Sequence, residues 1–362
     1  YKVCGGGLTH KIITEIPFDI SEVTESTIHS IRFSKDLSNT FTRTSETPLI
    51  YCTMREKLDQ FLLERAVEAG AMIRFEQAVE VSTDGDDQLV KTKSGQYNSR
   101  IVIGADGPSS IIARSCGLRN RIMQGLAWEA EIYTDLVLVE LYAKTVFLDW
   151  GTFPGGYGWV FPKKDHFSIG VGGPASLSKQ MMPYYDRFLQ YLDFGKAPET
   201  KSPLMNPVTQ SLKSWPIPVR LHKGPLHAGN VIVAGDAAGL TDSLTGEGIY
   251  YAIMSGKMAG YAALEQLRGN NNALQEYSEK VNDTLLDELL EGEKIKHIFN
   301  TFPLRIHLFV KNSDRAWRAF GKVLRGERSY RDVKLGFGKW SIFWNVIASL
   351  SKHVEKWRER RF

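Results

Sequence analysis

The segment at residues 230–267 constrains the fold of this chain more than any other part of its sequence. It opens with the apolar run Val231-Ile232-Val233-Ala234, which is typical of a parallel strand buried on both faces. Gly235-Asp236 ends the run, and a glycine-rich loop then leads into a predicted helix of small residues over 248–267. Because open α/β sheets bind ligands beyond the carboxyl ends of their strands, the Asp236 carboxylate is placed to accept hydrogen bonds from sugar-like hydroxyl groups.

The loop after this strand carries glycines where a ligand would approach. Gly246 and Gly248 have no side chains, so the backbone N–H groups at the start of the next helix can approach an anionic or electron-rich ligand. A structural turn with a capping Asp is the simpler alternative. The complete spacing, with the helix of small residues after it, favours ligand binding.

Segments predicted to form a parallel α/β structure alternate along the chain with segments predicted to form antiparallel strands. A second apolar run, Ile101-Val102-Ile103-Gly104-Ala105, predicts another buried parallel strand, whereas alternation of β-branched and aromatic residues predicts antiparallel strands elsewhere. The predicted antiparallel strands lie within residues 12–47 and at 72–83, 88–93, 137–147, 158–162 and 166–171, with a short strand at 49–52 and helices at 55–69, 183–192 and from 273 onward. This alternation favours two compact parts, each built from non-contiguous segments.

The composition is that of an ordinary globular protein. The 362 residues suffice for about two domains, and 43% apolar with 24% charged residues provides for sizeable cores, which excludes a disordered or fibrous protein. No run approaches the roughly 18 apolar residues of a spanning helix, and no basic-then-apolar leader is present, so we expect a cytoplasmic chain. Three dispersed cysteines and eight histidines show no metal-binding spacing, so no metal site is expected.

The C-terminal region is strongly basic. From residue 293 onward the chain holds 17 Lys and Arg against 6 Asp and Glu, and residues 339–362 combine an apolar stripe with a basic end. This pattern suits a helix in peripheral contact with a membrane surface; a helix docked on the protein body, with a solvated basic end, is the alternative. No nucleic-acid-binding pattern accompanies the charge. The stripe consists of Trp340, Phe343, Trp344, Ile347, Leu350, Val354 and Trp357, and the basic end of Lys352, Lys356, Arg358, Arg360 and Arg361.

Three further motifs carry chemistry. They are the glycine-rich start Lys2-Val3-Cys4-Gly5-Gly6-Gly7-Leu8, the segment Met54-Arg55-Glu56-Lys57-Leu58-Asp59, and Pro154-Gly155-Gly156-Tyr157-Gly158-Trp159-Val160-Phe161-Pro162 with Gly170-Val171-Gly172 after it. On a strand, Tyr157, Trp159 and Phe161 would share one face and form a flat apolar wall suited to a polyprenyl chain. An ordinary sheet core is the alternative.

In these motifs the chain resembles the FAD-dependent geranylgeranyl reductase family of the p-hydroxybenzoate hydroxylase-like flavoproteins. The resemblance implies an α/β plus antiparallel β fold: a Rossmann-like FAD/NAD(P)-binding domain with an inserted antiparallel-sheet substrate domain, followed by C-terminal helices. The expected FAD-binding domain comprises residues 1–10, 48–118 and 225–268. The expected substrate domain comprises 11–47 and 119–224, and the helical region 269–362.

The resemblance also implies roles for individual residues. It places the FAD ribityl chain at Asp236 and the edge of the flavin ring at the start of the helix after it. It makes the 154–162 motif the substrate site, and it brings the Cys4 loop beside flavin and substrate. The implied cofactor-binding residues are Cys4, Gly5, Gly7, Arg55, Val79, Asp236, Gly246, Gly248 and Ile249; the implied substrate-binding residues are Pro154, Tyr157, Trp159 and Phe161.

One family element does not occur in these residues. The family opens with a βαβ unit whose strand–Gly-x-Gly-x-x-Gly–helix motif holds the ADP half of FAD, and no such motif is found here. A unit of this kind with its connector takes about 40 residues, and we expect it to precede Tyr1.

The expected function is the reduction of carbon–carbon double bonds in a geranylgeranyl or other prenyl chain, free as a diphosphate or within a lipid. An isolated alkene accepts hydride poorly, so a proton must arrive almost simultaneously, from Tyr157, Cys4 or an ordered water. NADPH or a ferredoxin would supply electrons. The alternatives are a flavin-dependent monooxygenase or halogenase on the same scaffold, and a non-catalytic prenyl-lipid-binding protein.

Overall fold

The computed structural model describes residues 2–85, 87–119, 122–192, 208–209, 212–336 and 344–359. By their internal packing, the residues group into two units. Unit 1 comprises Tyr1–Arg65, Gly125–Trp215 and Lys294–Phe362, and unit 2 comprises Ala66–Gln124 and Pro216–Glu293. Both units are built from non-contiguous segments. The expected division into FAD-binding domain, substrate domain and helical region is a functional one and stays a prediction.

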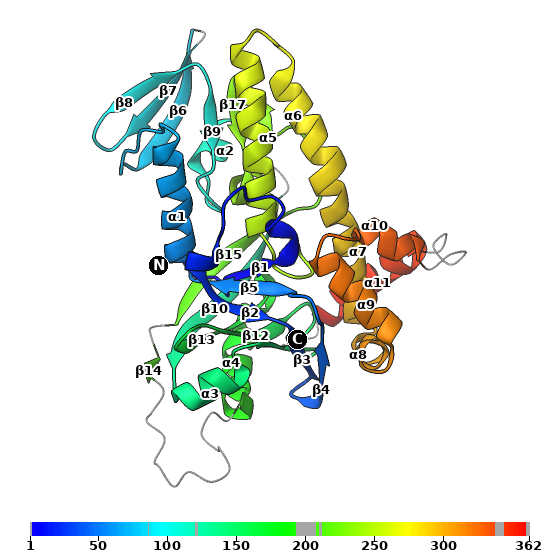
Figure 1. The fold of residues 1–362 in the computed structure, drawn as a ribbon. Helices are drawn as coiled ribbons and strands as arrows, with labels where there is room; N and C mark the ends of the chain where they lie inside the picture. Colours follow the sequence, from blue (N-terminus) through cyan, green and yellow to red (C-terminus); the bar gives the residue numbers. More distant parts are fainter. Residues whose placement is uncertain are drawn as a thin grey trace. The chain divides into compact units, whose positions relative to one another are not determined.

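The main sheet of unit 1 is long and mostly antiparallel (Figure 1). Its strand order is β14-β10-β13-β12-β11-β3-β4, with β15 paired to β10. Strands β11 and β3 are parallel, and the other neighbours along this order are antiparallel. Helix α4 (Ser178–Leu192) buries Tyr184, Tyr185 and Phe188 in the core of this sheet. The strands are β3 (Ser30–Lys35), β4 (Ser38–Thr44), β10 (Ile122–Tyr133), β11 (Thr145–Trp150), β12 (Tyr157–Pro162), β13 (His166–Pro174), β14 (Val208–Thr209) and β15 (Lys213–Arg220).

One predicted strand of this region is wrong. Residues 136–142 form helix α3 (Leu136–Tyr142), and strand β11 begins only at Thr145. The Asp135 side chain accepts a hydrogen bond from the Val137 N–H at 2.9 Å and so caps the helix. Within the helix only Val139 is buried, whereas Val137 is 70% exposed. The Val and Leu residues of this segment predicted a strand, but the segment is helical.

A second sheet in unit 1 holds the N-terminal glycine segment. Its order is β1-β5-β2, with β1 (Gly7–Thr9) and β2 (Thr24–Ile28) both antiparallel to β5 (Ile50–Thr53). Helix α1 (Arg55–Glu68) follows β5 directly, close to its predicted bounds. The strands predicted within 12–47 are confirmed from Thr24 onward, where β2, β3 and β4 lie.

The C-terminal part of the chain is helical, as predicted. The stripe residues Trp340 and Phe343 and the basic residues Arg360 and Arg361 lie outside the described residues. The helices are α7 (Asp287–Thr301), α8 (Pro303–Asn312), α9 (Asp314–Leu324), α10 (Tyr330–Leu335) and α11 (Trp344–Glu359).

Unit 2 contains the two apolar runs, which pair as parallel strands. In the sheet β16-β17-β9, strand β17 (Val231–Val233) is parallel to β9 (Val102–Gly104) and antiparallel to β16 (His227–Ala228). Strand β17 is fully buried, but Ile103 of β9 is 40% exposed, so the prediction of burial on both faces is wrong for β9. Strand β9 lies at an edge of this sheet, and none of the described strands pairs with its other side.

Helices and a hairpin sheet complete unit 2. Helix α5 (Ile249–Leu267) runs beside α6 (Ala273–Val281), and a π-helical turn (Asn282–Leu286) follows α6 (Figure 1). The predicted hairpin is confirmed, but its first strand begins at Ala78 and not at residue 72. Strands β6 (Ala78–Asp84) and β7 (Asp87–Thr92) pair, and β8 (Gln96–Ser99) joins them. The short helix α2 (Ile111–Ser115) packs beside β6.

Candidate active site

The N-terminal loop packs so closely within unit 1 that its glycine positions have no room for a side chain. A Cβ atom on Gly5 or on Gly7 would lie 2.7 Å from the Phe161 ring. Gly6 has φ +64°, and a Cβ atom there would lie 1.8 Å from the Thr53 carbonyl oxygen. The structure thus brings the predicted residues Gly5, Gly7 and Phe161 together, and it gives the loop a shape that only glycine permits.

Cys4 lies between two other site groups. Its backbone N–H donates to Oε1 of Glu129 at 2.8 Å, and its Sγ accepts from the Gly6 N–H at 3.4 Å. The Arg55 guanidinium lies beside the thiol and also forms a two-pronged hydrogen bond with Asp59, at 2.9 and 2.8 Å. Burial lowers the pKa of Arg55, but Cys4 and Asp59 outweigh burial and the pKa rises. Cys4 and Arg55, predicted from separate motifs, are therefore neighbours.

The aromatic residues of β12 form a supported surface. The ring centroids of Tyr157 and Trp159 lie 5.4 Å apart. A Cβ atom on Gly170 would lie 2.4 Å from the Trp159 indole, and one on Gly172 would lie 3.1 Å away, so the downstream glycines make room for this side chain. The indole is buried, and its Nε1–H donates to Oε2 of Glu129 at 2.7 Å. Pro154 lies in the turn just before β12.

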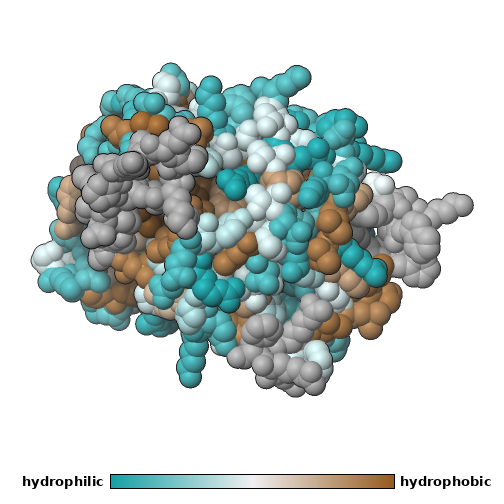
Figure 2. All heavy atoms as spheres, turned by 90° about the horizontal axis from the view of Figure 1, so that it is seen from below, coloured by the Kyte–Doolittle hydropathy of each residue, from teal (hydrophilic) through white to brown (hydrophobic). Residues whose placement is uncertain are grey.

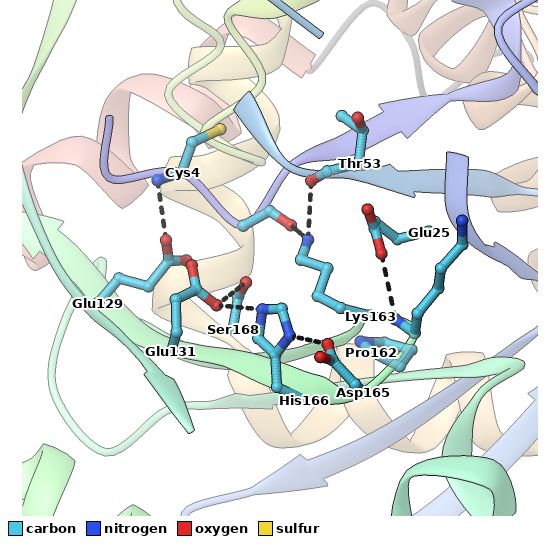
Figure 3. Close-up of polar contacts among 12 residues, drawn as sticks. Cys4, Glu25, Thr53, Glu129, Glu131, Pro162, Lys163, Asp165, His166 and Ser168 are labelled. Atoms are coloured by element: carbon cyan, nitrogen blue, oxygen red, sulfur yellow. Dashed lines mark hydrogen bonds and ion pairs between the residues drawn. The ribbon is translucent and has the colours of Figure 1, made fainter. Parts of the chain in front are cut away.

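Strand β10 contributes buried carboxyl groups that the sequence did not reveal (Figure 3). Glu129 and Glu131 alternate with Ala130 and are both buried. Burial raises the pKa of Glu129 to about 7, and the charge of Glu131 adds to the rise, against the hydrogen bond from Trp159. Glu131 accepts from the Ser168 hydroxyl at 2.6 Å and lies 3.1 Å from Nε2 of His166.

The imidazole of His166 lies between the buried Glu131 and Asp165, whose side chain is exposed. Its Nδ1 lies 2.6 Å from the carboxylate of Asp165 (Figure 3). Burial lowers the pKa of His166, but the hydrogen bonds and charges of Glu131 and Asp165 outweigh burial and raise the pKa. His166 therefore favours its charged form beside two carboxylates.

Lys163 is the buried cation of this region. Its Nζ donates to the carbonyl oxygens of Gly5 at 2.7 Å and Thr53 at 3.0 Å (Figure 3). The side chain is fully buried, which is rare for lysine. It thereby holds the glycine loop against β5. The sequence offers one weak signal for Lys163: it directly follows the Phe-Pro that ends the aromatic motif.

In unit 2, Asp236 follows β17 at a tight turn. Gly239, with φ +75°, ends this turn. The buried Arg220 fixes the turn: its Nε donates to the Ala238 carbonyl at 2.7 Å, and its Nη2 donates to the Leu118 carbonyl at 3.0 Å. The Asp236 carboxylate accepts from the Thr241 hydroxyl at 3.3 Å. Arg220 was not recognised from the sequence, because nothing near it marks it as buried.

The start of helix α5 lies against Asp236. A Cβ atom on Gly248 would lie 3.3 Å from Oδ1 of Asp236, so a side chain at this position would crowd the carboxylate. Gly248 is the N-cap of α5, Ile249 is its first residue, and Gly246 turns the chain with φ +75°. A carboxylate beside an open helix N-terminus suits a group that carries both hydroxyls and an electron-rich edge, and these residues therefore fit FAD.

Val79 is not part of this arrangement. It lies on β6, in a sheet separate from β17, and is 43% exposed. Its cofactor role therefore rests on the resemblance alone.

Among the residues that the structure describes, no group of three or more His, Cys, Asp or Glu is arranged to hold a metal ion. Within the same residues, every helix is too short or too polar to cross a bilayer.

Comparisons with known proteins bear on this site. The family model described as FAD binding domain matches residues 10–285. A digeranylgeranylglycerophospholipid reductase of Methanocaldococcus jannaschii is 28% identical over 261 residues, which is 68% of this chain and 64% of that protein. The chain therefore spans just under two thirds of that reductase.

Solved structures share the fold. A geranylgeranyl bacteriochlorophyll reductase-like protein of Thermoplasma acidophilum matches with a TM-score of 0.67 and 24% identity, covering 82% of this chain and 77% of that one. A flavin-dependent brominase matches with a TM-score of 0.71 and 20% identity, covering 97% and 90%. These matches confirm the predicted fold class, and the reductase-named relative confirms the resemblance.

Proposed function

Because the chain belongs to the FAD binding domain family, it is a flavin-dependent oxidoreductase with FAD as its cofactor, and we propose that it saturates carbon–carbon double bonds of a prenyl chain. The buried Trp159 indole carries this proposal. Its position is fixed by Glu129 and by the glycines of β13, and it lies in contact with Tyr157. A rigid aromatic surface of this kind binds an extended apolar chain and excludes water from it.

The chain's own residues would hold the cofactor and supply a proton. We propose that Asp236, Gly246, Gly248 and Ile249 bind FAD in unit 2, that Cys4, Gly5, Gly7 and Arg55 bind it in unit 1, and that Val79 contributes from β6. Reduced FAD, when bound, supplies the hydride.

Two side chains are candidates for the proton donor. The sulfur of Cys4 faces the Gly6 N–H and the Arg55 guanidinium, so it keeps hydrogen-bond donors around it after giving up a proton. Tyr157 lies at the start of β12, against Trp159. Both groups belong to unit 1, as the proposed substrate surface does.

The relatives and the aromatic surface support the proposed substrate class. A relative named for a digeranylgeranylglycerophospholipid supports a prenyl lipid, and a prenyl diphosphate has the same apolar chain. NADPH or a ferredoxin is the proposed electron donor.

Peripheral membrane contact is proposed through α11. Ala348, Ser351 and Glu355 form its buried side. Ile347, Leu350, Val354 and Trp357 are exposed along one helical stripe, with Leu350 64% and Trp357 53% exposed. Figure 2 shows that exposed apolar side chains also gather in patches on the face seen from below. A cytoplasmic enzyme acting on a membrane lipid needs an apolar face of this kind.

The test separates substrate binding from folding. Protein loaded with FAD is reduced by dithionite under anaerobic conditions and mixed with a geranylgeranylated lipid, and the product is analysed by mass spectrometry. Trp159→Ala should lower prenyl reduction far more than bound flavin, because Trp159 belongs to the substrate surface. An equal loss of both would show that Trp159 only supports folding. Cys4→Ser and Tyr157→Phe, assayed in parallel, identify the proton donor.

The alternatives give different results in the same experiment. A monooxygenase or halogenase, which the brominase match keeps open, would form product only when oxygen is admitted. A prenyl-lipid-binding protein would bind the lipid without the absorbance of bound flavin and without a change in product mass.

A further inference from the structure

The carboxyl group of Glu129 joins two segments that the sequence analysis treated separately. One oxygen accepts the backbone N–H of Cys4 at 2.8 Å (Figure 3). The other accepts the indole N–H of Trp159 at 2.7 Å. Both partners can only donate, and an ionised carboxylate can only accept. The ionised form of Glu129 therefore matches both partners at once, whereas a protonated carboxyl group brings a hydrogen that neither partner can accept.

The surroundings of Glu129 bring its titration close to neutrality. The side chain is fully buried, and burial with the nearby Glu131 raises its pKa to about 7. Lys163, from the turn after β12, opposes this rise together with the two hydrogen bonds. On α4, the pKa of Tyr185 is raised by burial and further by the charge of Glu129. His166 lies 3.1 Å from Glu131, and Asp165 lies beside His166.

We propose that Glu129 is a positioning residue that locks the Cys4 loop to the Trp159 indole while its carboxyl group is ionised. The Cys4 loop and the Trp159 indole both belong to the proposed active site. The importance of the lock for catalysis therefore rests on the proposed function. The lock itself is a property of unit 1 and can be measured in protein that has no substrate.

The lock makes the site sensitive to pH. Because the pKa of Glu129 is about 7, the ionised form prevails above neutrality and the protonated form below it. Protonation turns one of the two carboxylate oxygens into a hydroxyl, which is a weaker acceptor for its N–H donor. The loop should therefore loosen as the pH falls through neutrality.

Glu129→Gln and Glu131→Gln form a matched pair of variants. Both replace a buried carboxyl group on β10 with an amide of the same shape. In Glu129→Gln, the side-chain NH₂ group faces either the Cys4 N–H or the Trp159 N–H, and neither of these can accept a hydrogen bond. The lock should therefore be lost at every pH. Gln at position 131 keeps both contacts of Glu129 and removes the charge that raises its pKa, so the lock should persist to lower pH.

The readout is amide hydrogen exchange in the peptide over residues 2–8, followed by mass spectrometry and corrected for the intrinsic pH dependence of exchange. At about pH 8 the Cys4 amide should exchange about tenfold faster in Glu129→Gln than in the wild type, because it loses a hydrogen bond to a charged acceptor. At about pH 5.5 the two proteins should exchange alike, because the wild-type carboxyl group is then protonated. Glu131→Gln should resemble the wild type at the higher pH and remain protected at pH values where the wild type has lost protection.

The outcomes distinguish the lock from the proposed function. Equal exchange of wild type and Glu129→Gln at about pH 8, or equal acceleration by both variants, would overturn the lock. If the predicted exchange is found but no variant or wild type reduces a prenyl chain, the lock stands and the proposed function fails. If Glu129→Gln does not fold, the pH dependence of hydrogen exchange in the wild type tests the lock. The lock then requires that the peptide containing Cys4 loses protection below neutrality while the β2 peptide keeps it.

Discussion

At the scale of single residues, the space around Gly170 makes a sharp prediction. A Cβ atom there would lie 2.4 Å from the Trp159 ring and 2.7 Å from the Trp128 carbonyl oxygen. The indole could turn aside, but the backbone carbonyl cannot. Gly170→Ala should therefore displace Trp159 and lower the free energy of unfolding by about 1–3 kcal/mol, as overpacking does. Urea unfolding measures the loss.

Gly256→Ala is the matched control, for which we expect the free energy of unfolding to change in the opposite direction. Gly256 lies inside α5, and a Cβ atom there would meet nothing within 4 Å. Alanine lowers the conformational entropy of the unfolded chain, so the free energy of unfolding should rise by about 0.5–1 kcal/mol. If Gly170→Ala were as stable as Gly256→Ala, the glycines of β13 would not be there to accommodate the indole.

Glu129 also predicts a pH dependence of stability. Its folded pKa of about 7 lies above the ordinary value of 4.5, so between these values the folded chain binds more protons than the unfolded chain. The contribution of Glu129 to the free energy of unfolding therefore falls as the pH rises from 4.5 to 7, by about 3 kcal/mol in all. Urea unfolding of wild type and Glu129→Gln across this range should show the difference between them changing in that direction; a constant difference would contradict the raised pKa.

At the scale of elements, the sequence was informative wherever local pattern and burial agree. The apolar run of β17 and the alternation of β12 and β13 predicted strands that the structure has, and α1 lies close to its predicted bounds. The prediction of a strand over residues 136–142 was wrong, because Asp135 caps a helix there and half of the apolar side chains of this helix are exposed. Capping outweighed the strand propensity of valine in that segment.

The attachment of α11 gives an element-scale prediction. The buried carboxylate of Glu355 hydrogen-bonds with His297, and Asn300 of α7 donates to it at 2.6 Å. Glu355→Ala removes the shared acceptor, which should cost about 1–3 kcal/mol and loosen α11. Limited proteolysis should then cut residues 344–359 faster than in the wild type. Lys352→Ala, on an exposed position of the same helix, is the control and should be cut at the wild-type rate.

At the scale of the whole molecule, the predicted site residues are divided between the two units. Cys4 and Trp159 belong to unit 1, and Asp236 and Gly248 to unit 2. Their motifs could be recognised one by one, because each has a local spacing. Glu129 and Lys163 could not. Acids alternating along a strand are typical of a solvent-facing surface, and only pairing with strands distant in the sequence buries these.

The proposed membrane contact is tested at the scale of the whole molecule. Leu350 and Trp357 are exposed on α11, whereas Ala348 on the same helix is buried. Leu350→Glu should weaken co-sedimentation with vesicles of anionic phospholipid, since it places a charge in the apolar stripe. Glu140→Gln, on the exposed side of α3, should not weaken it. Equal binding by Leu350→Glu and wild type would show that α11 does not face the lipid.

The most direct test of the account is the mass of the prenyl product. Purified protein with bound FAD is reduced by dithionite in the absence of oxygen and given a geranylgeranylated lipid. We expect the lipid to gain the mass of two hydrogen atoms for each double bond saturated, with Trp159→Ala retaining flavin but forming little product. A protein that holds reduced FAD and the lipid together, yet returns the lipid with its mass unchanged, would contradict the proposed reaction.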